Sequence, residues 1–400
     1  MRFLLTLVAA GILGAPSTFA QYIRGKIYPE KQIYLLGEPL IAVLDIESIG
    51  TSPIQIGDSP CLETTRFEVP DASRPRRISL YGCESGLAVS CLGGIVRLQA
   101  GQHDLRRILV SAGPFDYFKF DLPGSYHIHA STSVTVYADR SAGESEELGK
   151  IEVESDFNVI LVRATESELR QAFDPYLQGL KSTNVEARAL AVAAVTQYPQ
   201  DFFQDVLVGL ADDSLERSAG IAGLENLGTA GAKERLAQLS GAGNDEAVRQ
   251  KAIQALGELD DPAYCPLMLD MAKRDPQYSG TIAARAAGAL CGEKALPTLL
   301  TLLAQVKPNM RPEIAHAVGN TQSRGAVTPL ISLLLDRNVE LRIAATQALA
   351  ALTHRRSAHD VNSEESALQA YREWTGWWGL NAQRAAIYGV KDCTQPEPLN

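Results

Sequence analysis

Residues 244–256 read NDEAVRQKAIQAL, and the fold follows from this stretch because the chain repeats its pattern. Arg249 is followed seven residues later by Leu256, which places both on the same side of a helix. Asn244 and Asp245 are residue types that begin helices by accepting hydrogen bonds from free backbone N–H groups. The intervening alanines favour the helical state and let helices approach closely. The stretch therefore predicts one alanine-rich helix packed against others of its kind.

The same marker pair, an arginine and an apolar residue seven positions later, recurs along the chain. In one unit Ala283 replaces the arginine, while Leu290 keeps the apolar position. Successive apolar markers lie 29, 32, 34, 28 and 31 residues apart. A recurrence near thirty residues is typical of a solenoid, whose hairpins stack because none can bury its own apolar face. The marker pairs are Arg188 and Val195, Arg217 and Leu224, Arg249 and Leu256, Arg311 and Val318, and Arg342 and Leu349.

Each unit predicts a leucine-rich first helix and an alanine-rich second helix, giving about six hairpins over residues 165–352. The pattern resembles HEAT repeats, in particular the short HEAT-like repeats of the phycobilisome-lyase type. The resemblance implies a non-catalytic binding surface. It carries over no lyase activity, because no chromophore-handling residues can be recognised.

The recurring arginines Arg188, Arg217, Arg249, Arg311 and Arg342 have two interpretations. They could form a charged ladder along the concave face that grips an acidic partner. Alternatively, each could bridge to carbonyls or acids of the neighbouring repeat. The second interpretation is favoured, because the arginine occupies a fixed site in almost every unit whereas a ligand would touch only some.

Residues 21–163 have a different period, because their apolar residues tend to alternate, as in residues 54–56 and 126–129. Many short alternating runs separated by turn residues predict an antiparallel β-sandwich. The run from Phe118 to Tyr126 resembles the tyrosine corner of immunoglobulin-like domains, in which the Tyr hydroxyl bonds nearby backbone. The resemblance implies that fold and no particular function.

His127 and His129 lie two residues apart and so point to the same face of a strand. Such a pair can begin a metal site, but no third ligand is visible in the sequence. A solvated or hydrogen-bonded strand face is the favoured interpretation. No metal and no cofactor are predicted.

Residues 1–20 have the features of a cleaved signal peptide. Arg2 precedes an apolar run over residues 3–13, and Thr18 and Ala20 fit the small-residue positions of a cleavage site. A membrane anchor is the alternative, but the run is too short to span a bilayer, and no later stretch is long enough. The mature protein is therefore expected to begin near Gln21 and to be periplasmic or secreted.

Export makes disulfides possible for the six cysteines. Cys83 and Cys91 flank a short loop and are one candidate pair. Cys265 and Cys291 are a second, because they fall at neighbouring ends of two antiparallel helices. Metal binding is the alternative for the cysteines, but the chain has no C-x-x-C motif.

Residues 353–400 follow the last repeat. They contain a helical pattern with all three tryptophans, Trp374, Trp377 and Trp378. A helix that caps the exposed end of the solenoid is the favoured interpretation, and a tryptophan patch that binds carbohydrate or a partner is the alternative. The last residues, with Cys393, Pro396 and Pro398, are expected to be loose.

The formal net charge of -10 and the absence of basic runs argue against nucleic acid as a partner. The chain contains no nucleophile elbow, zinc-protease motif, phosphate-binding loop or dinucleotide fingerprint. The favoured hypothesis is an exported, non-catalytic scaffold that binds a protein through the concave surface of the solenoid. The alternatives are a binder of carbohydrate or envelope polymer that acts through the β-sandwich, and an enzyme with an unrecognised site.

Overall fold

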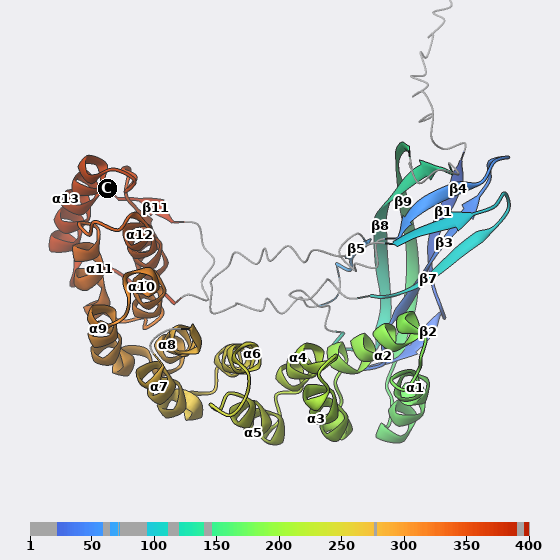
Figure 1. The fold of residues 1–400 in the computed structure, drawn as a ribbon, viewed down its shortest axis with the longest axis horizontal. Coiled ribbons are helices and arrows are strands. Elements are labelled where there is room, and N and C mark those ends of the chain that lie inside the picture. Colours follow the sequence, from blue (N-terminus) through green and yellow to red (C-terminus); the bar gives the residue numbers. More distant parts are fainter. Residues whose placement is uncertain are drawn as a thin grey trace, which may run out of the picture. The chain divides into compact units, whose positions relative to one another are not determined.

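A computed structural model describes residues 22–58, 65–70, 72, 94–110, 120–139, 146–275, 278–389 and 396–399 (Figure 1). These residues fall into two compact units, and the boundary between the units lies at Leu169 and Arg170. The predicted signal peptide and four cysteines, Cys61, Cys83, Cys91 and Cys393, lie outside the described residues. The signal peptide and the Cys83–Cys91 pair therefore remain predictions, as do the exact domain bounds.

The first unit contains two sheets. The smaller has three antiparallel strands in the order β1 (Ile23–Pro29), β3 (Ile41–Ser48) and β7 (His103–Leu109). In the larger sheet β2 pairs with β9 in parallel and the other pairs are antiparallel, with β5 attached to β8. Its strands are β2 (Ile33–Leu35), β9 (Glu147–Val162), β8 (Gly124–Ala138), β4 (Ile54–Asp58), β6 (Gly94–Leu98) and β5 (Thr65–Glu68).

The alternation of side chains in the strands builds one core from both sheets. Ile27 and Ile46 of the small sheet are buried in the same cluster as Ile128, Val136 and Phe157 of the large sheet. Along β8 buried residues alternate with more exposed ones, as the period of two predicts. The predicted antiparallel β unit is confirmed.

The structure describes the predicted tyrosine corner from Phe120 to Tyr126, while Phe118 and Lys119 lie outside the described residues. The Tyr126 hydroxyl donates to the carbonyl oxygen of Leu122 at 2.7 Å, and the Phe120 ring packs edge-on at 5.0 Å between centroids. This bond fixes the turn that leads into β8. The immunoglobulin-like assignment of the unit remains a prediction.

Helical hairpins fill the second unit, apart from the first turn of α1, which lies before the boundary, and they confirm the predicted helical repeat region. The first helices are α1 (Glu166–Gly179), α3 (Gln204–Asp212), α5 (Ala230–Leu239), α7 (Cys265–Arg274), α9 (Leu296–Gln305) and α11 (Val327–Leu333). The second helices are α2 (Val185–Gln197), α4 (Arg217–Leu227), α6 (Glu246–Glu258), α8 (Tyr278–Cys291), α10 (Arg311–Gly319) and α12 (Val339–Thr353). Short 3-10 turns precede five helices: η1 (Asp201–Phe203), η2 (Pro262–Tyr264), η3 (Gly292–Ala295), η4 (Pro308–Met310) and η5 (Arg324–Ala326).

The loops within units begin several second helices through side-chain caps. Asn184, Asp245 and Asn338 accept hydrogen bonds from the free N–H groups of α2, α6 and α12. The first of these bonds is 2.8 Å long, from the Ala187 N–H to the Asn184 side chain. Polar residues in these loops therefore fix where the second helices start.

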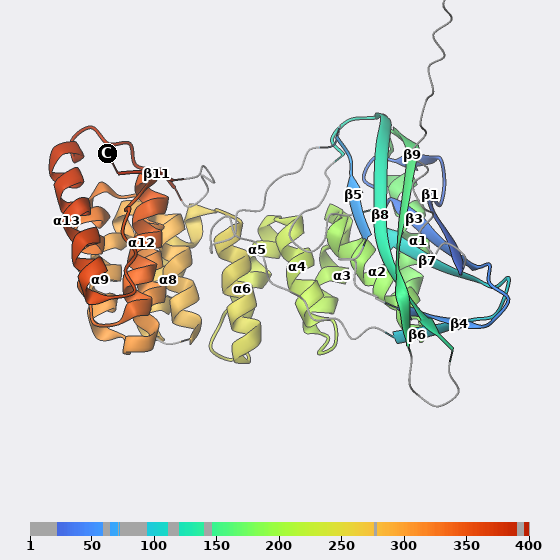
Figure 2. The same cartoon turned by 90° about the horizontal axis from the view of Figure 1, so that it is seen from above.

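The second helices form the inner row of the stack and the first helices the outer row (Figure 1). Successive second helices stand side by side, as α4, α6 and α8 do in Figure 2. They approach closely because small residues meet there. A Cβ atom on Gly288 of α8 would lie 2.2 Å from the Ala317 carbonyl oxygen of α10, and one on Gly319 would lie 2.7 Å from the Ala348 Cβ of α12. Leucines fill the outer row instead, so the unequal side-chain volumes favour curvature toward the second helices.

The segment after α12 contains helix α13 (Glu364–Asn381), which begins at a capping box formed by Ser363 and Ser366 and lies beside α11. The expectation of a loose end is wrong for residues 396–399. Strand β11 (Glu397–Pro398) pairs in parallel with β10 (Arg355–Arg356), because the backbone N–H groups of Glu397 and Leu399 find acceptors there. None of the helices in the described ranges is long and apolar enough to cross a membrane.

Candidate interaction surfaces

The marker arginines of the second helices link each repeat to the next. The Arg188 guanidinium on α2 donates to Glu216 at 2.9 Å and to Asp213 at 3.2 Å, both in the next unit. Arg217 on α4 donates to Asp245, the residue that caps α6, at 3.1 Å. The hydrogen bond to Glu216 raises the pKa of Arg188, and the Leu215 N–H is the main cause of a lowered pKa at Asp213. Both groups are therefore charged at neutral pH.

The pattern continues in later repeats. Arg249 on α6 donates to Asp275 at 3.2 Å, and Arg311 on α10 donates to Asp336 at 2.9 Å. Each acceptor lies in the unit that follows its arginine. We call this series of contacts the arginine ladder.

The fourth unit, where Ala283 replaces the marker arginine, is linked by a different residue. Arg285 of α8 is buried and donates to Glu313 of α10 at 2.7 Å. Arg285 lies two positions after the marker site, so the spacing of seven residues between arginine and apolar residue does not identify it. The ladder therefore continues through the unit in which its marker is absent.

Among the described residues, the last marker arginine, Arg342 on α12, bonds only to carbonyl oxygens. It donates to Val361 at 2.7 Å and to Asn362 at 3.0 Å, both beyond the last repeat, and to Asp336 at 2.8 Å. The side chain is buried. The ladder thus ends by fixing the segment that leads into α13.

These contacts bear on the two interpretations of the arginines. In every unit with an arginine marker, the guanidinium is engaged by groups of its own or the following unit. Such engagement favours the bridging interpretation over direct capture of an acidic partner. The surface left for a partner is therefore the part of the second helices that lies between the contacts of the arginine ladder, which we call its rungs.

Exposed side chains occur on the second helices α2, α4, α6 and α12. We call five of them the inner strip: Ala189 on α2, Ser218 on α4, Lys251 on α6, and Ile343 and Gln347 on α12. Neighbouring second helices and the unit's own first helix cover the other sides of each helix, so these residues face the inside of the stack. The Lys251 ammonium donates to the Ser218 hydroxyl at 2.7 Å, which links the strip across α4 and α6.

A half-buried histidine, His316, lies on α10 near the buried Arg285. Burial, with a smaller contribution from the positive charge of Arg285, lowers the pKa of His316 to about 3. The imidazole is therefore neutral at physiological pH. Its burial on α10 makes this neutral imidazole a structural group in the inner row.

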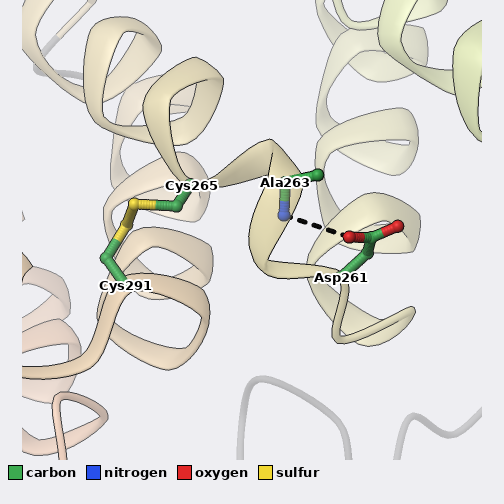
Figure 3. Close-up of a disulfide and its surroundings, with 4 residues drawn as sticks. All are labelled: Asp261, Ala263, Cys265 and Cys291. Carbon is green, nitrogen blue, oxygen red and sulfur yellow. Dashed lines mark hydrogen bonds between the residues drawn. A yellow bond between two sulfur atoms is a disulfide. The ribbon is translucent and has the colours of Figure 1, made fainter.

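Cys265 and Cys291 form a disulfide, with their Cα atoms 5.2 Å apart (Figure 3). Cys265 opens α7 and Cys291 ends α8, so the bond joins the two helices of one hairpin. Immediately before it, Asp261 accepts a hydrogen bond of 3.0 Å from the Ala263 N–H and fixes the turn into α7. The structure thus brings together one of the two candidate cysteine pairs.

The three tryptophans of α13 have different environments. Trp374 is fully buried, while Trp377 and Trp378 are half-buried and continue the cluster with ring centroids 5.8 and 6.0 Å apart. Arg324 of η5 lies over the Trp378 ring at 5.8 Å and donates to the carbonyls of Ala382 and Ala385. A helix so attached to the last repeat favours the capping interpretation over a free tryptophan patch.

His127 and His129 of β8 share one partner on β9. Their ring nitrogens lie 3.3 and 3.1 Å from the same carboxylate oxygen of Asp156, and His127 also lies 3.2 Å from Asn158. This is a hydrogen-bonded strand face. In the described part of the chain, no group of three or more His, Cys, Asp or Glu side chains could hold a metal ion.

Residues 202–280 and 281–350 match the family model of HEAT repeats, which confirms HEAT repeats in this segment, while the phycobilisome-lyase type remains a prediction. A search of curated proteins finds no match. Among solved structures, human deoxyhypusine hydroxylase in complex with glycerol is 16% identical, with a TM-score of 0.28, 53% of this chain covered and 96% of that chain.

Two bacterial alpha-2-macroglobulins also resemble the chain. The Salmonella protein reacted with methylamine is 11% identical with a TM-score of 0.18, and the match covers 88% of this chain and 27% of that one. The Escherichia coli protein activated by porcine elastase is 10% identical with a TM-score of 0.16, covering 88% and 37%. The chain thus spans about a third or less of each macroglobulin. TM-scores this low do not indicate a shared overall fold or function.

Proposed function

We propose that this chain, whose residues 202–350 are HEAT repeats, is an exported, non-catalytic scaffold that binds a protein partner through its inner strip. Stacked hairpins of this kind provide an extended surface rather than an enclosed pocket. The observation that carries the proposal is the engagement of the ladder arginines by groups of their own or the next unit. The inner strip, in contrast, keeps its side chains exposed between the rungs.

The chemistry of the inner strip indicates what it would recognise. Most of its members are small or uncharged, and Lys251 carries the one positive charge, close to Ser218. Ile343 is an exposed apolar residue in the middle of α12. The strip therefore suits a partner with a broad, mixed surface and a small apolar contact opposite α12.

Export is supported by two independent features. The sequence of residues 1–20 has the order of a cleaved signal peptide. The disulfide between Cys265 and Cys291 is of a kind that persists in oxidising compartments. We expect the intact mass of the isolated protein to correspond to a chain that begins near Gln21. A mass that includes residues 1–20 would contradict cleavage.

The binding proposal is tested with two matched substitutions in the full chain. Ile343→Arg adds a charge on the inner strip, and Thr301→Arg adds the same charge on α9 in the outer row, where Thr301 is exposed. Each variant and the unmodified protein is used to capture partners from an envelope fraction, followed by mass spectrometry. We expect the Ile343→Arg variant alone to lose the captured partner. A partner lost equally from both variants, or retained by both, contradicts binding at the inner strip.

A further inference from the structure

The C-terminal residues lie against a short stretch of backbone just after the last repeat. The Glu397 N–H donates to the His354 carbonyl at 2.8 Å, and the Leu399 N–H donates to the Arg356 carbonyl at 2.9 Å. The Arg355 guanidinium forms an ion pair with the Glu397 carboxylate. Residues 354–356 therefore act as a strand edge, which we call the docking edge, and residues 396–399 are its occupant.

The sequence of the occupant fits this one-sided pairing. Only alternate residues, 397 and 399, donate to the docking edge, and the positions beside them are Pro396 and Pro398. Proline has no N–H and favours extended backbone, so it costs no hydrogen bond where the chain faces away from the edge. It also prevents a further strand from adding on the outer side. The alternation thus favours a strand that pairs with one edge and ends there.

The contacts that hold the occupant are few. The backbone hydrogen bonds of a two-residue parallel pairing and one ion pair join it to the docking edge, and the Glu397 side chain is 70% exposed. The edge itself is held more firmly. The Leu352 carbonyl accepts from the Tyr388 N–H at 2.8 Å, and the Tyr388 ring stacks on His354 at 3.7 Å between centroids. The docking edge can therefore keep its form while its occupant exchanges.

We propose that residues 354–356 form a docking site for a partner protein, which adds an extended segment with an acidic residue between two prolines. The chain's own residues 396–399 occupy the site in the same way until that segment displaces them. Strand addition supplies hydrogen bonds that any extended backbone can make, and side chains supply the selectivity. Here the selectivity comes from Arg355, which pairs with the acidic residue. The site is separate from the inner strip and does not depend on it.

The test opens the site in the full chain. Glu397→Ala removes the ion pair and Leu399→Pro removes one backbone donor, so the double variant weakens the pairing of the tail with the docking edge and places no new charge on the tail. The probe is a capped synthetic peptide with the sequence Pro-Glu-Pro-Leu at millimolar concentration, observed by saturation-transfer NMR, which detects weak binding to a large protein. We expect the transfer signal with the double variant to be at least threefold that with the unmodified chain, whose own tail competes.

Charge reversal supplies the matched controls. Adding Arg355→Glu to the double variant should abolish the signal, whereas adding Arg356→Glu, which changes the exposed neighbour, should leave it. The same peptide with arginine in place of glutamate should bind the Arg355→Glu variant. Unchanged circular dichroism and melting of each variant exclude loss of folding.

Three results would overturn the proposal. The first is equal transfer from the acidic and basic peptides in the double variant, and the second is no transfer from either. The third is a dimer that disperses on Glu397→Ala, because the docking edge would then accept the tail of a second copy rather than a partner's segment.

Discussion

The guanidinium groups of Arg342 and Arg217 occupy equivalent helix positions but have different surroundings. Arg342 is 2% exposed and donates to the carbonyl oxygens of four residues, where no solvent can take the place of the guanidinium. The Arg217 side chain is 32% exposed, and its acidic partner Asp245 is 59% exposed. A buried group that loses its partners costs far more than an exposed ion pair that opens. The same residue type therefore contributes differently along the ladder.

We predict that Arg342→Met destabilises the helical unit by about 3 kcal/mol, because it leaves buried carbonyls without donors. Arg217→Met should cost less than about 1 kcal/mol, as expected for an exposed pair. Chemical denaturation followed by circular dichroism measures both. Equal costs for the two variants would contradict the distinction drawn between them.

His316 predicts a dependence of stability on pH. Its folded pKa of about 3 lies below its ordinary value of 6.5, so between these values the unfolded state binds more protons. The contribution of the neutral imidazole to the free energy of unfolding is fully present above pH 6.5 and is lost as the pH falls toward 3. Between pH 7 and pH 5 the loss should be about 2 kcal/mol.

The variant that isolates this contribution is His316→Gln. We expect its unfolding free energy to change less between pH 7 and pH 5 than that of the unmodified chain. The charged group that acts on the imidazole is Arg285, and Glu313 accepts a hydrogen bond from Arg285. Parallel stability curves for the two proteins would show that the imidazole ionises equally in both states.

At the scale of helices, the close approach of α8 and α10 depends on Gly288. Even Gly288→Ala brings a methyl group to 2.2 Å from the Ala317 carbonyl, so the helices must separate. We predict a destabilisation of about 1–3 kcal/mol, as for overpacked cores. The matched control is Gly376→Ala on α13, where no described atom lies within 4 Å of the new methyl. It should be neutral or stabilise by up to about 1 kcal/mol, and thermal melting compares the two.

The disulfide between α7 and α8 closes a segment with a sequence separation of 26 residues. Closing a loop of that length removes unfolded-state freedom equivalent to about 3 kcal/mol. We predict a loss of this order when both Cys265 and Cys291 are replaced by serine, measured by denaturation under oxidising conditions. The double substitution is preferable to a reductant, because four further cysteines lie outside the described residues. An unchanged midpoint would mean that the cross-link does not restrict the unfolded chain.

The helical hairpins could be predicted because their signal is local and repeated. An apolar residue seven positions after an arginine recurs at nearly constant spacing, and each recurrence lies within one helix. Polar residues such as Asp245 predicted where the second helices begin for the same reason. The alternation along β8 was equally local, so the antiparallel unit followed from it.

Partners that lie far apart in the sequence could not be predicted. Except for Arg342, which bonds to carbonyl oxygens, each ladder arginine pairs with an acid of the next repeat, at a sequence distance that varies with loop length. The role of Arg285 could not be predicted, because it links α8 to α10 from a helix position other than the marker site. The pairing of Glu397 with residue 355 depends on how the chain returns after α13, which no local pattern encodes.

At the scale of the whole molecule, the two compact units predict two unfolding transitions. Ile128 is fully buried in the β unit and Leu299 in the helical unit. We predict that Ile128→Ala shifts one calorimetric transition and Leu299→Ala the other, each by the equivalent of about 2–5 kcal/mol. If both substitutions moved a single shared transition, the units would not be independent.

The ladder contacts join only adjacent repeats, and this also determines how the stack deforms under a mechanical force. Releasing an exposed rung such as that of Arg217 costs at most about 1 kcal/mol, so two neighbouring repeats can separate slightly and return without disturbing the others. Around α8 and α12 the buried side chains of Arg285 and Arg342 resist the same displacement. The solenoid is therefore expected to deform more easily between α2 and α6 than toward α12.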